Sequence, residues 1–442
     1  MKKLVLTSIL FTCVLSLSVS GQTHEELLEL FEEGQFFFKR GDYEDAAHYY
    51  LKLVRADSMN ANFNFKLGES YLNIPGKEHL SIPYFEKAVQ KIVPKNSYNK
   101  RSFYETTAPL HAFFYLGNAY RINNQLDKAL EFYMKFIDSP YFYDNYNLNI
   151  VDREIKSCER AKIIQDAPLA FVKINLGSAI NTNFSEEKPV ISGNGKSLVF
   201  IRKLKFYDAI FFSQKKDGEW QNAVNINPQV LSDGEYYPTG LSYEGNTLLL
   251  VKKVNDTYDI YYSEFDGTIW SEAKKLGNKI NTIFNEVYAA FGADDETIYI
   301  TSNRKGGRGG YDIYISKLDN QGEWSKPKNL GKQINTELNE RDASFCSDQD
   351  LLFFSSEGHY SMGGFDIFYC RKSGKKWQVS LNIGYPINDT RDNLFYSPAH
   401  DNCRKGYYSL IDEEGFGETD IYLIEITSEN TLNFSQTDTD KY

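Results

Sequence analysis

The chain is poor in the residues that build metal centres and disulfide frameworks. Its 442 residues include 5 cysteines and 6 histidines. The cysteines lack zinc-site spacing, and neither His-Glu-x-x-His nor Cys-x-x-Cys occurs. After residue 19 no run approaches the roughly 20 apolar residues that cross a bilayer. We therefore predict no metal, no cofactor and no transmembrane segment in the mature protein.

Basic charge is also in short supply. The 49 Lys and Arg are outnumbered by 60 Asp and Glu, which gives a formal net charge of −11. A nucleic-acid binder needs a basic stripe that meets phosphates, so this balance argues against nucleic-acid partners. An acidic balance is equally typical of a protein kept soluble in an exported compartment.

Residues 1–21 have the pattern of an export signal. Lys2 and Lys3 precede an apolar stretch that ends in the small residues Ser18, Ser20 and Gly21. We predict a signal peptide over 1–21 and a periplasmic mature protein. The alternative is an outer-membrane lipoprotein anchored at Cys13, because Leu-Phe-Thr-Cys loosely resembles a lipobox.

Aromatic residues are abundant, with 32 Tyr and 31 Phe, and many stand in a repeated phrase. Asp-Ile-Tyr or a degenerate copy begins at residues 208, 259, 312, 366 and 420, at intervals of 51–54 residues. A period near 50 built from aromatic and β-branched runs is typical of a propeller blade. Each unit contains four predicted strands, which in the second unit cover 236–241, 247–252, 259–264 and 270–275.

Strand counting predicts five blades and the way the ring closes. A Trp strand follows the Asp-Ile-Tyr strand in four units, and the fifth lacks one. The missing strand matches 170–177, which aligns with 270–277. We predict that it completes the fifth blade beside 420–426. Leu-Gly and Ile-Asn-Thr phrases mark the loops that lead from one blade to the next.

The repeated residues have structural and functional interpretations. The Asp either accepts backbone N–H bonds or contributes to a cation-binding ring, and we favour the structural role because it occurs in every blade. The Trp series is assigned to packing between blades. Cys346 and Cys370 fall on first and third strands of one blade, too far apart to bridge. The cysteines are interpreted as buried apolar thiols, and a Cys370–Cys403 bridge is the alternative.

Residues 23–166 show helical periodicity and three tetratricopeptide-like segments. Small residues such as Gly68 and Gly117 recur where paired helices approach, and aromatic residues recur beside them. A further helix over 151–164 is predicted to cap the stack. The functional interpretation is that Asn64, Asn118 and Arg121 line a groove and bind a peptide; the alternative is that they are solvated polar positions.

Catalytic motifs are missing. Gly-x-Ser-x-Gly does not occur, and the Gly-rich run 306–310 is not followed by the Lys-Ser/Thr of a phosphate loop. We predict no enzyme and no catalytic residue. The alternative is an enzyme whose catalytic carboxylates lie on a face of the propeller.

The motifs together resemble exported proteins that combine tetratricopeptide repeats with a TolB-like, WD-repeat-like β-propeller. Asn-Leu-Gly with Ile-Asn-Thr, Gly-Gly-Tyr/Phe-Asp-Ile-Tyr/Phe and Asp-Gly-x-Trp carry the resemblance over almost the whole mature chain. The chain is similar to the front part of periplasmic OmpA-family proteins, some of them type IX secretion-associated. It lacks their OmpA-like module, so direct peptidoglycan binding is not implied.

The predicted architecture is multidomain, α followed by all-β. It comprises a signal peptide (1–21), tetratricopeptide-like repeats (23–166), a five-bladed propeller closed by its N-terminal strand (169–427) and a polar tail (428–442). The predicted function is a non-enzymatic periplasmic scaffold for protein partners near an outer-membrane or type IX secretion-related assembly. The alternative is a sensor or carrier whose propeller binds a glycan or peptide.

Overall fold

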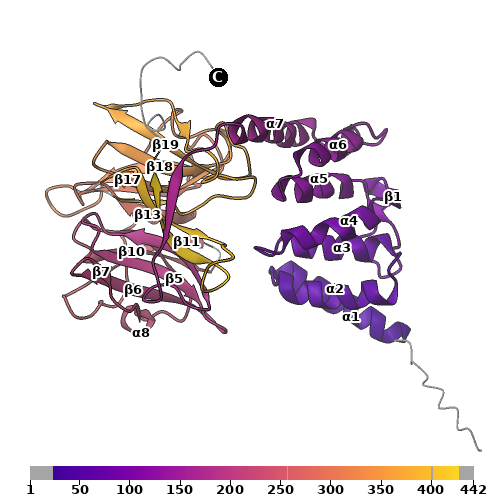
Figure 1. Ribbon diagram of the computed structural model, residues 1–442, viewed down its shortest axis with the longest axis horizontal. Helices are drawn as coiled ribbons and strands as arrows, with labels where there is room; N and C mark the ends of the chain where they lie inside the picture. Colours follow the sequence, from indigo (N-terminus) through magenta and orange to yellow (C-terminus); the bar gives the residue numbers. More distant parts are fainter. Residues whose placement is uncertain (1–22, 256, 400–401, 428–442) are drawn as a thin grey trace, which may run out of the picture. The chain divides into compact units, whose positions relative to one another are not determined.

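A computed structural model describes residues 23–255, 257–399 and 402–427 (Figure 1). The predicted signal peptide with Cys13 and the polar tail lie outside the described residues. The chain forms two compact units. The first contains the residues up to Ala119 together with Phe132–Tyr146, and the second contains Tyr120–Glu131 and the residues from Asn147 onward. The predicted fold class, helical repeats followed by a five-bladed propeller, is confirmed.

Helices occupy most of the residues before 166. Their bounds are α1 His24–Arg40, α2 Tyr43–Ala56, α3 Ala61–Leu72, α4 Ile82–Ala88, α5 Ala112–Ile122, α6 Leu126–Ile137 and α7 Leu148–Gln165, with 3₁₀ turns η1 Glu78–Ser81 and η2 Lys95–Ser97 and the short strands β1 Ile92–Val93 and β2 Ala108–Pro109. Helix α1 begins with a capping box, in which Thr23 and Glu26 each accept the other's backbone N–H. It ends at Gly41, whose φ of 85° suits a left-handed cap.

Small residues and aromatic rings pair between helices of the first unit, as the repeat pattern predicts. A Cβ added to Gly34 would lie 2.7 Å from the ring of Tyr50. At Gly117 it would lie 2.4 Å from the ring of Tyr133. Because no Cβ fits at these distances, glycine is what lets each ring pack against the neighbouring helix.

Helix α7 forms as predicted, but it belongs to the second unit. Ser157 donates a hydrogen bond of 3.1 Å to the carbonyl of Gly363, and the Arg160 guanidinium lies 5.0 Å from the Tyr360 ring centroid. The helix predicted to cap the repeat stack therefore packs on the loops of the fourth blade.

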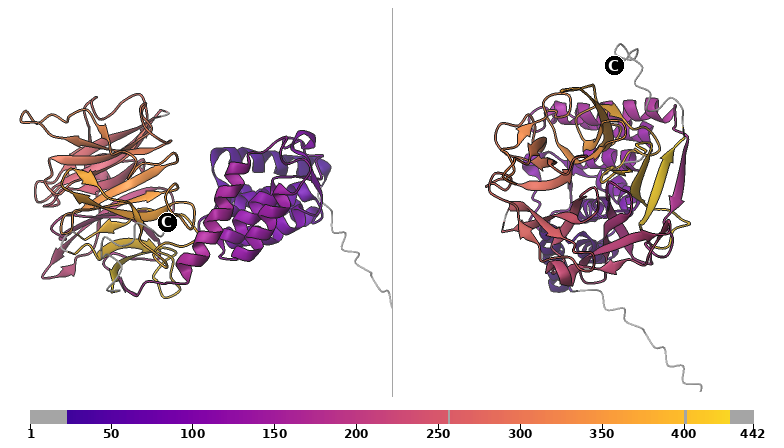
Figure 2. Two further views of the ribbon diagram at one scale, coloured as in Figure 1. Left: turned by 90° about the horizontal axis from the view of Figure 1, so that it is seen from above. Right: turned by 90° about the vertical axis from the view of Figure 1, so that its left-hand side faces the viewer.

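Five antiparallel sheets surround a central axis in the second unit (Figure 2). In blade order the strands are β4 Ser185–Ile191, β5 Ser197–Lys203, β6 Asp208–Lys216, β7 Glu219–Trp220 and β8 Val224–Asn225; β9 Tyr236–Leu241, β10 Thr247–Val254, β11 Thr257–Glu264 and β12 Lys274–Lys275; β13 Glu286–Phe291, β14 Thr297–Ser302, β15 Asp312–Lys317 and β16 Lys328–Asn329; β17 Glu340–Cys346, β18 Leu351–Ser356, β19 Asp366–Ser373, β20 Lys376–Trp377 and β21 Leu381–Asn382; β22 Ser397–Pro398, β23 Lys405–Leu410, β24 Asp420–Ile426 and β3 Phe171–Asn175. A short helix, α8 Asn227–Val230, follows β8.

The ring closes as predicted. Strand β3 pairs antiparallel with β24, from Phe171 opposite Ile426 to Asn175 opposite Tyr422. An N-terminal strand thus completes the C-terminal blade. The outermost strands are shorter than predicted: β12 pairs only Tyr261 and Tyr262, and Trp270 makes an isolated bridge to Phe265.

Hydrophobic side chains gather between the blades. Each of five clusters joins residues of two adjacent sheets. Trp270 of the second blade packs edge-on against Phe212 of the first, with ring centroids 5.3 Å apart. Trp377 of the fourth blade packs against Tyr299 of the third at 6.4 Å. The prediction that the Trp series packs between blades is confirmed.

The Asn of each Ile-Asn-Thr phrase binds the Ile of an Asp-Ile-Tyr strand. Asn281 accepts from the Ile260 N–H at 2.7 Å and donates to its carbonyl at 2.8 Å. Asn335 does the same at Ile313, with 2.8 and 2.9 Å. Equivalent pairs join Asn181 to Ile421 and Asn388 to Ile367. These buried amides fix the loop between blades to the third strand.

The repeated Asp accepts backbone hydrogen bonds from the glycine-rich turn before it. Asp366 accepts from the N–H groups of Met362 and Gly363 at 2.8 and 3.1 Å. Asp420 accepts from Phe416 and Gly417 at 2.7 and 3.2 Å. The structural interpretation of this residue is confirmed in these blades.

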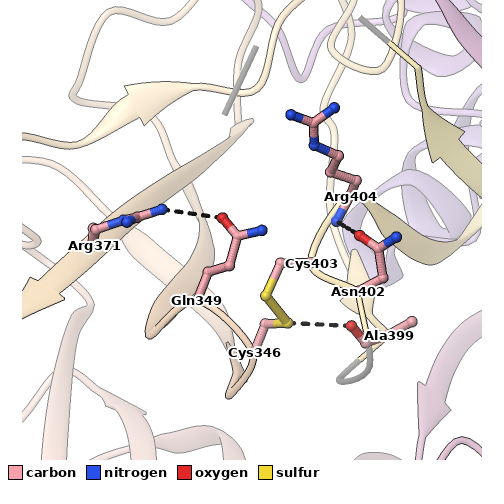
Figure 3. The surroundings of a disulfide bond; sticks show 7 residues. All are labelled: Cys346, Gln349, Arg371, Ala399, Asn402, Cys403 and Arg404. Carbon is pink, nitrogen blue, oxygen red and sulfur yellow. Dashed lines mark hydrogen bonds between the residues drawn. A yellow bond between two sulfur atoms is a disulfide. The ribbon is translucent and has the colours of Figure 1, made fainter. Parts of the chain in front are cut away.

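One disulfide corrects the cysteine prediction. Cys403 bonds to Cys346, with Cα atoms 5.8 Å apart (Figure 3). Cys370 is a buried free thiol. Cys346 lies on the inner strand β17, and Cys403 lies in the turn between β22 and β23. Because β17 and β22 are neighbouring inner strands of adjacent blades, the ring brings these cysteines together and leaves Cys370 inside its own blade. The Ala399 carbonyl lies 3.2 Å from the Cys346 sulfur, which carries no proton in the disulfide.

Among the described residues, the helices are too short or too polar to cross a membrane.

Candidate functional site

The three predicted groove residues have separate roles. Asn64 is fully buried, and its amide donates to the carbonyls of Ser58 and Asn60. Asn118 is half-buried and accepts from the Tyr133 hydroxyl at 2.7 Å. Arg121 is 7% exposed, donates to the Thr390 carbonyl at 2.6 Å and lies 3.2 Å from the Glu154 carboxylate. The structure thus differs from the prediction: Asn64 and Arg121 are not exposed to a peptide, because both side chains are buried.

Another part of the helical unit gathers basic charge around one acid. Lys66 of α3 is 8% exposed, and its ammonium lies 5.5 Å from the Phe31 ring centroid and 5.8 Å from that of Tyr50. Burial together with the neighbouring Lys100 and Lys39 lowers the pKa of Lys66 to about 8, and Glu69 opposes the shift. Burial raises the pKa of Glu69 to about 7. We call Lys39, Lys66 and Lys100 the basic cluster.

The basic cluster has aromatic and polar neighbours. Phe65 packs edge-on against Tyr98 and Tyr115, with ring centroids 6.2 and 5.8 Å away. The Tyr98 hydroxyl donates to Asn62 at 2.6 Å, whereas the buried Asn62 Nδ2 has no hydrogen-bond partner within the described residues. Helix α1, helix α3 and the loop after η2 each contribute one lysine. No sequence motif marks the cluster, since only folding joins these segments.

The second unit contains a cavity of about 510 Å³ among the inner strands of its blades. Its lining includes Lys188 of β4, Tyr237 of β9, Tyr288 of β13 and Arg341 of β17, together with Phe365 and Phe395. Hydrogen bonds fix the start of two of the strands that carry these residues, β4 and β17. Glu186, which is fully buried, accepts from the Thr182 N–H and hydroxyl and from Arg202. Thr336 holds Glu340 in the same way.

Two cations of this cavity share one aromatic ring. The Lys188 ammonium lies 5.1 Å from the Phe395 ring centroid, and the Arg341 guanidinium lies 5.6 Å from it. Lys188 also lies 3.9 Å from the centroid of Tyr237. Burial lowers the pKa of Lys188, and Glu187 and Asp342 oppose the shift. Cation–π contact supports both charges, but it replaces lost water only in part.

A buried carboxylate stands behind Arg341. Asp342 is 2% exposed, and its Oδ2 lies 3.0 Å from the Arg341 Nε. Neither carboxylate oxygen accepts a well-aligned hydrogen bond within the described part of the chain. Burial raises the pKa of Asp342, and the Arg341 charge opposes this. The carboxylate holds the arginine by charge.

Three residues at or beside the cavity have a positive φ. Lys188 lies in a bulge of β4 and has a φ of 53°. Asp342 lies in the corresponding bulge of β17 with a φ of 55°, and Phe395 has a φ of 62°. Bulges re-aim side chains, and non-glycine residues at positive φ concentrate at ligand-binding sites.

The cavity residues could not be found from the repeat pattern, because they differ from one repeat unit to the next. The two residues after each of Glu186, Glu286 and Glu340 differ from blade to blade, whereas those three acids and their threonines recur. Variation one or two positions after a recurring acid was the available signal. Within the described ranges, no group of three or more His, Cys, Asp or Glu side chains could hold a metal ion.

Comparison with known proteins finds one family match, in the helical region. Residues 110–139 match the tetratricopeptide repeat family. No curated protein is significantly similar in sequence. Solved structures similar to the chain include TolB from Acinetobacter baumannii (14% identity over 56% of this chain and 56% of that chain, TM-score 0.35), the first TPR domain of human RPAP3 (21%, 32% and 94%, TM-score 0.24) and an alpha-L-arabinofuranosidase from Lactobacillus brevis (12%, 59% and 93%, TM-score 0.38). The chain spans 56% of the length of that TolB protein.

Proposed function

We propose that the protein is a non-enzymatic scaffold whose helical unit binds an acidic segment of a partner protein. Tetratricopeptide repeats generally mediate protein–protein interactions, and residues 110–139 match that family. The observation that carries the proposal is the basic cluster, in which Lys39 and Lys100 act on the buried Lys66, in a chain of net charge −11.

Charge complementarity points to the partner's chemistry. Lys39 and Lys100 are exposed, and both act electrostatically on the buried Lys66. A surface of this kind lowers the energy of an approaching carboxylate and repels basic segments. The partly exposed Tyr98 and Tyr115, which pack on the buried Phe65, provide apolar area for the partner's backbone and side chains.

The proposed setting is the periplasm, near an outer-membrane or type IX secretion-related assembly. The export pattern of residues 1–21 and the resemblance to periplasmic repeat–propeller proteins support it. Anchoring of a lipoprotein at Cys13 would place the same interaction at the membrane surface.

The test is cross-linking in living cells, followed by affinity purification of the tagged full-length protein and mass spectrometry. Charge reversal in a Lys39→Glu/Lys100→Glu variant should weaken capture of the specific partners by about tenfold or more, since each exposed ion pair contributes up to about 1 kcal/mol and reversal adds repulsion. A Lys52→Glu/Lys87→Glu variant has the same net charge and alters lysines outside the cluster, so it should retain those partners.

Three results would decide the proposal. Outer-membrane or secretion proteins lost only from the cluster variant would support it. Equal recovery from both variants would refute the role of the basic cluster. Recovery of the protein alone, at good yield, would refute the scaffold.

A second candidate function is a ligand-binding propeller that acts as a sensor or carrier. The cavity of about 510 Å³ favours it, because this volume falls within the usual range of small-molecule sites.

A further inference from the structure

The propeller cavity has an unusual charge composition for this protein. Acidic residues outnumber basic ones by 60 to 49 along the chain, yet the cavity lining contains Lys188 and Arg341 and no Asp or Glu. No carboxylate lies within ion-pair distance of the Lys188 ammonium among the described residues. Arg341 has Asp342 on its buried side and a face toward the cavity.

We infer that this cavity binds a small ring-bearing carboxylate, whose anionic group is held between Lys188 and Arg341 and whose ring packs on the surrounding aromatic side chains. This inference rests on the ligand-binding candidate and is independent of the scaffold role.

The distances support one shared anion. Both cations approach the Phe395 ring, at 5.1 and 5.6 Å from its centroid, and both line the same cavity. A guanidinium binds a carboxylate through two parallel N–H bonds, and an ammonium adds a point charge. The charge of Lys188, which faces only rings at close range, gains a counter-ion when the ligand binds.

The rest of the lining suits a flat ring. Six aromatic residues contribute to it: Tyr237, Tyr258, Tyr288, Tyr311, Phe365 and Phe395. Their faces can pack against an aromatic ring or the apolar face of a sugar, and the hydroxyls and Asn339 can bond to polar substituents. Aromatic acids and acidic sugars share this chemistry, so both are represented in the test.

The backbone adds an independent indication. Lys188 and Asp342 occupy corresponding bulges with positive φ, a conformation that costs about 1–3 kcal/mol per non-glycine residue. A bulge directs Lys188 toward the cavity and places Asp342 behind Arg341. Inner strands β9 and β13 bulge as well, so the bulge belongs to the repeat, and the positive φ is what distinguishes Lys188 and Asp342.

The test uses the full-length mature protein and two matched pairs of probes. Isothermal titration calorimetry would compare glucuronate with glucose, and benzoate with benzamide. We expect an anion to bind and its neutral counterpart to bind at least about tenfold more weakly. Binding of glucuronate alone would assign an acidic sugar, and binding of benzoate alone would assign an aromatic acid.

Variants locate the site. Lys188→Met should weaken the bound anion by about 10- to 100-fold, the usual effect of losing one charge-assisted hydrogen bond, and Lys188→Arg should retain most binding. Lys196→Met removes an exposed lysine of the same blade and should bind like the wild type. Thermal melts of each variant confirm that the comparison is between folded proteins.

Several results would overturn the inference. They are no binding of either anion, equal binding of the neutral probes, and an affinity of Lys188→Met equal to that of Lys196→Met. If carboxylates fail to bind while the Lys39→Glu/Lys100→Glu variant still loses its partners, this inference fails and the scaffold stands.

Discussion

Asn281 ties the loop after the second blade to the third strand of that blade. It is 5% exposed, and it accepts from the Ile260 N–H at 2.7 Å. Its amide donates to the carbonyls of Ile260 and Leu276 at 2.8 and 2.9 Å. Because β12 pairs only Tyr261 and Tyr262, no strand residue accepts from the Ile260 amide on that side.

The cost of Asn281→Ala follows from these contacts. The Ile260 carbonyl keeps the Leu276 N–H, 3.0 Å away, but the Ile260 N–H loses its acceptor in a buried position. An unsatisfied buried group costs about 1–3 kcal/mol, and the lost hydrogen bonds add about 1 kcal/mol. We therefore expect the free energy of unfolding of the propeller to fall by about 2–4 kcal/mol, and Tm by about 5–10 °C.

Urea and thermal unfolding followed by circular dichroism would measure this effect. The matched control is Asn278→Ala, three residues earlier, where the side chain is exposed and the change should stay within about 0.5 kcal/mol. Equal stability of the two variants would refute the assignment of Asn281 as the link between loop and strand.

Asn281→Asp keeps the hydrogen-bond acceptor of this side chain and removes its two donor hydrogens. The new carboxylate still accepts from Ile260 but faces two carbonyl oxygens, so burial and these dipoles raise its pKa in the folded state. A group whose pKa is higher in the folded state stabilises the protein fully at pH values below its unfolded-state pKa. This stabilisation is lost as pH rises through its folded-state pKa. This variant should therefore be more stable in mild acid than at neutral pH, relative to wild type. A pH-independent difference would contradict the donor role.

Two further changes test other parts of the structure. Cys403→Ala opens a loop with a sequence separation of 57 and should cost about 4 kcal/mol of unfolding free energy under oxidising conditions; reductant should lower the Tm of the wild type but not of the variant, and an equal response would argue against the bridge. The folded pKa of Glu69 is about 7, against an ordinary 4.5, so this residue adds stability that is full below pH 4.5 and is lost as pH rises through 7. Glu69→Gln should remove this pH dependence, which amounts to at most about 1.4 kcal/mol of unfolding free energy per pH unit, as measured by urea unfolding at a series of pH values. If the unfolding free energies of variant and wild type depend on pH equally, Glu69 is not desolvated.

The repeated features of the propeller followed from the sequence because each blade meets nearly identical neighbours. The strand predicted at 236–241 has the same bounds as β9, and the closing strand pairs where strand counting placed it. Local rules suffice at these positions: an Asp accepts from the preceding turn, and a Trp fills the gap beside the next sheet.

The features that bear on function depended on the tertiary structure. Cys346 meets Cys403 only because two inner strands become neighbours around the ring, and helix α7 joins the propeller unit although its sequence continues the repeats. The Asn64 and Arg121 side chains donate hydrogen bonds to backbone carbonyls in buried positions, which no repeat pattern specifies. Lys188 and Arg341 are separated by about three blades of sequence, and ring closure places both over Phe395. A repeat fixes the residues that hold adjacent units together and leaves free those that face a ligand, so recognition becomes visible only after the chain has folded.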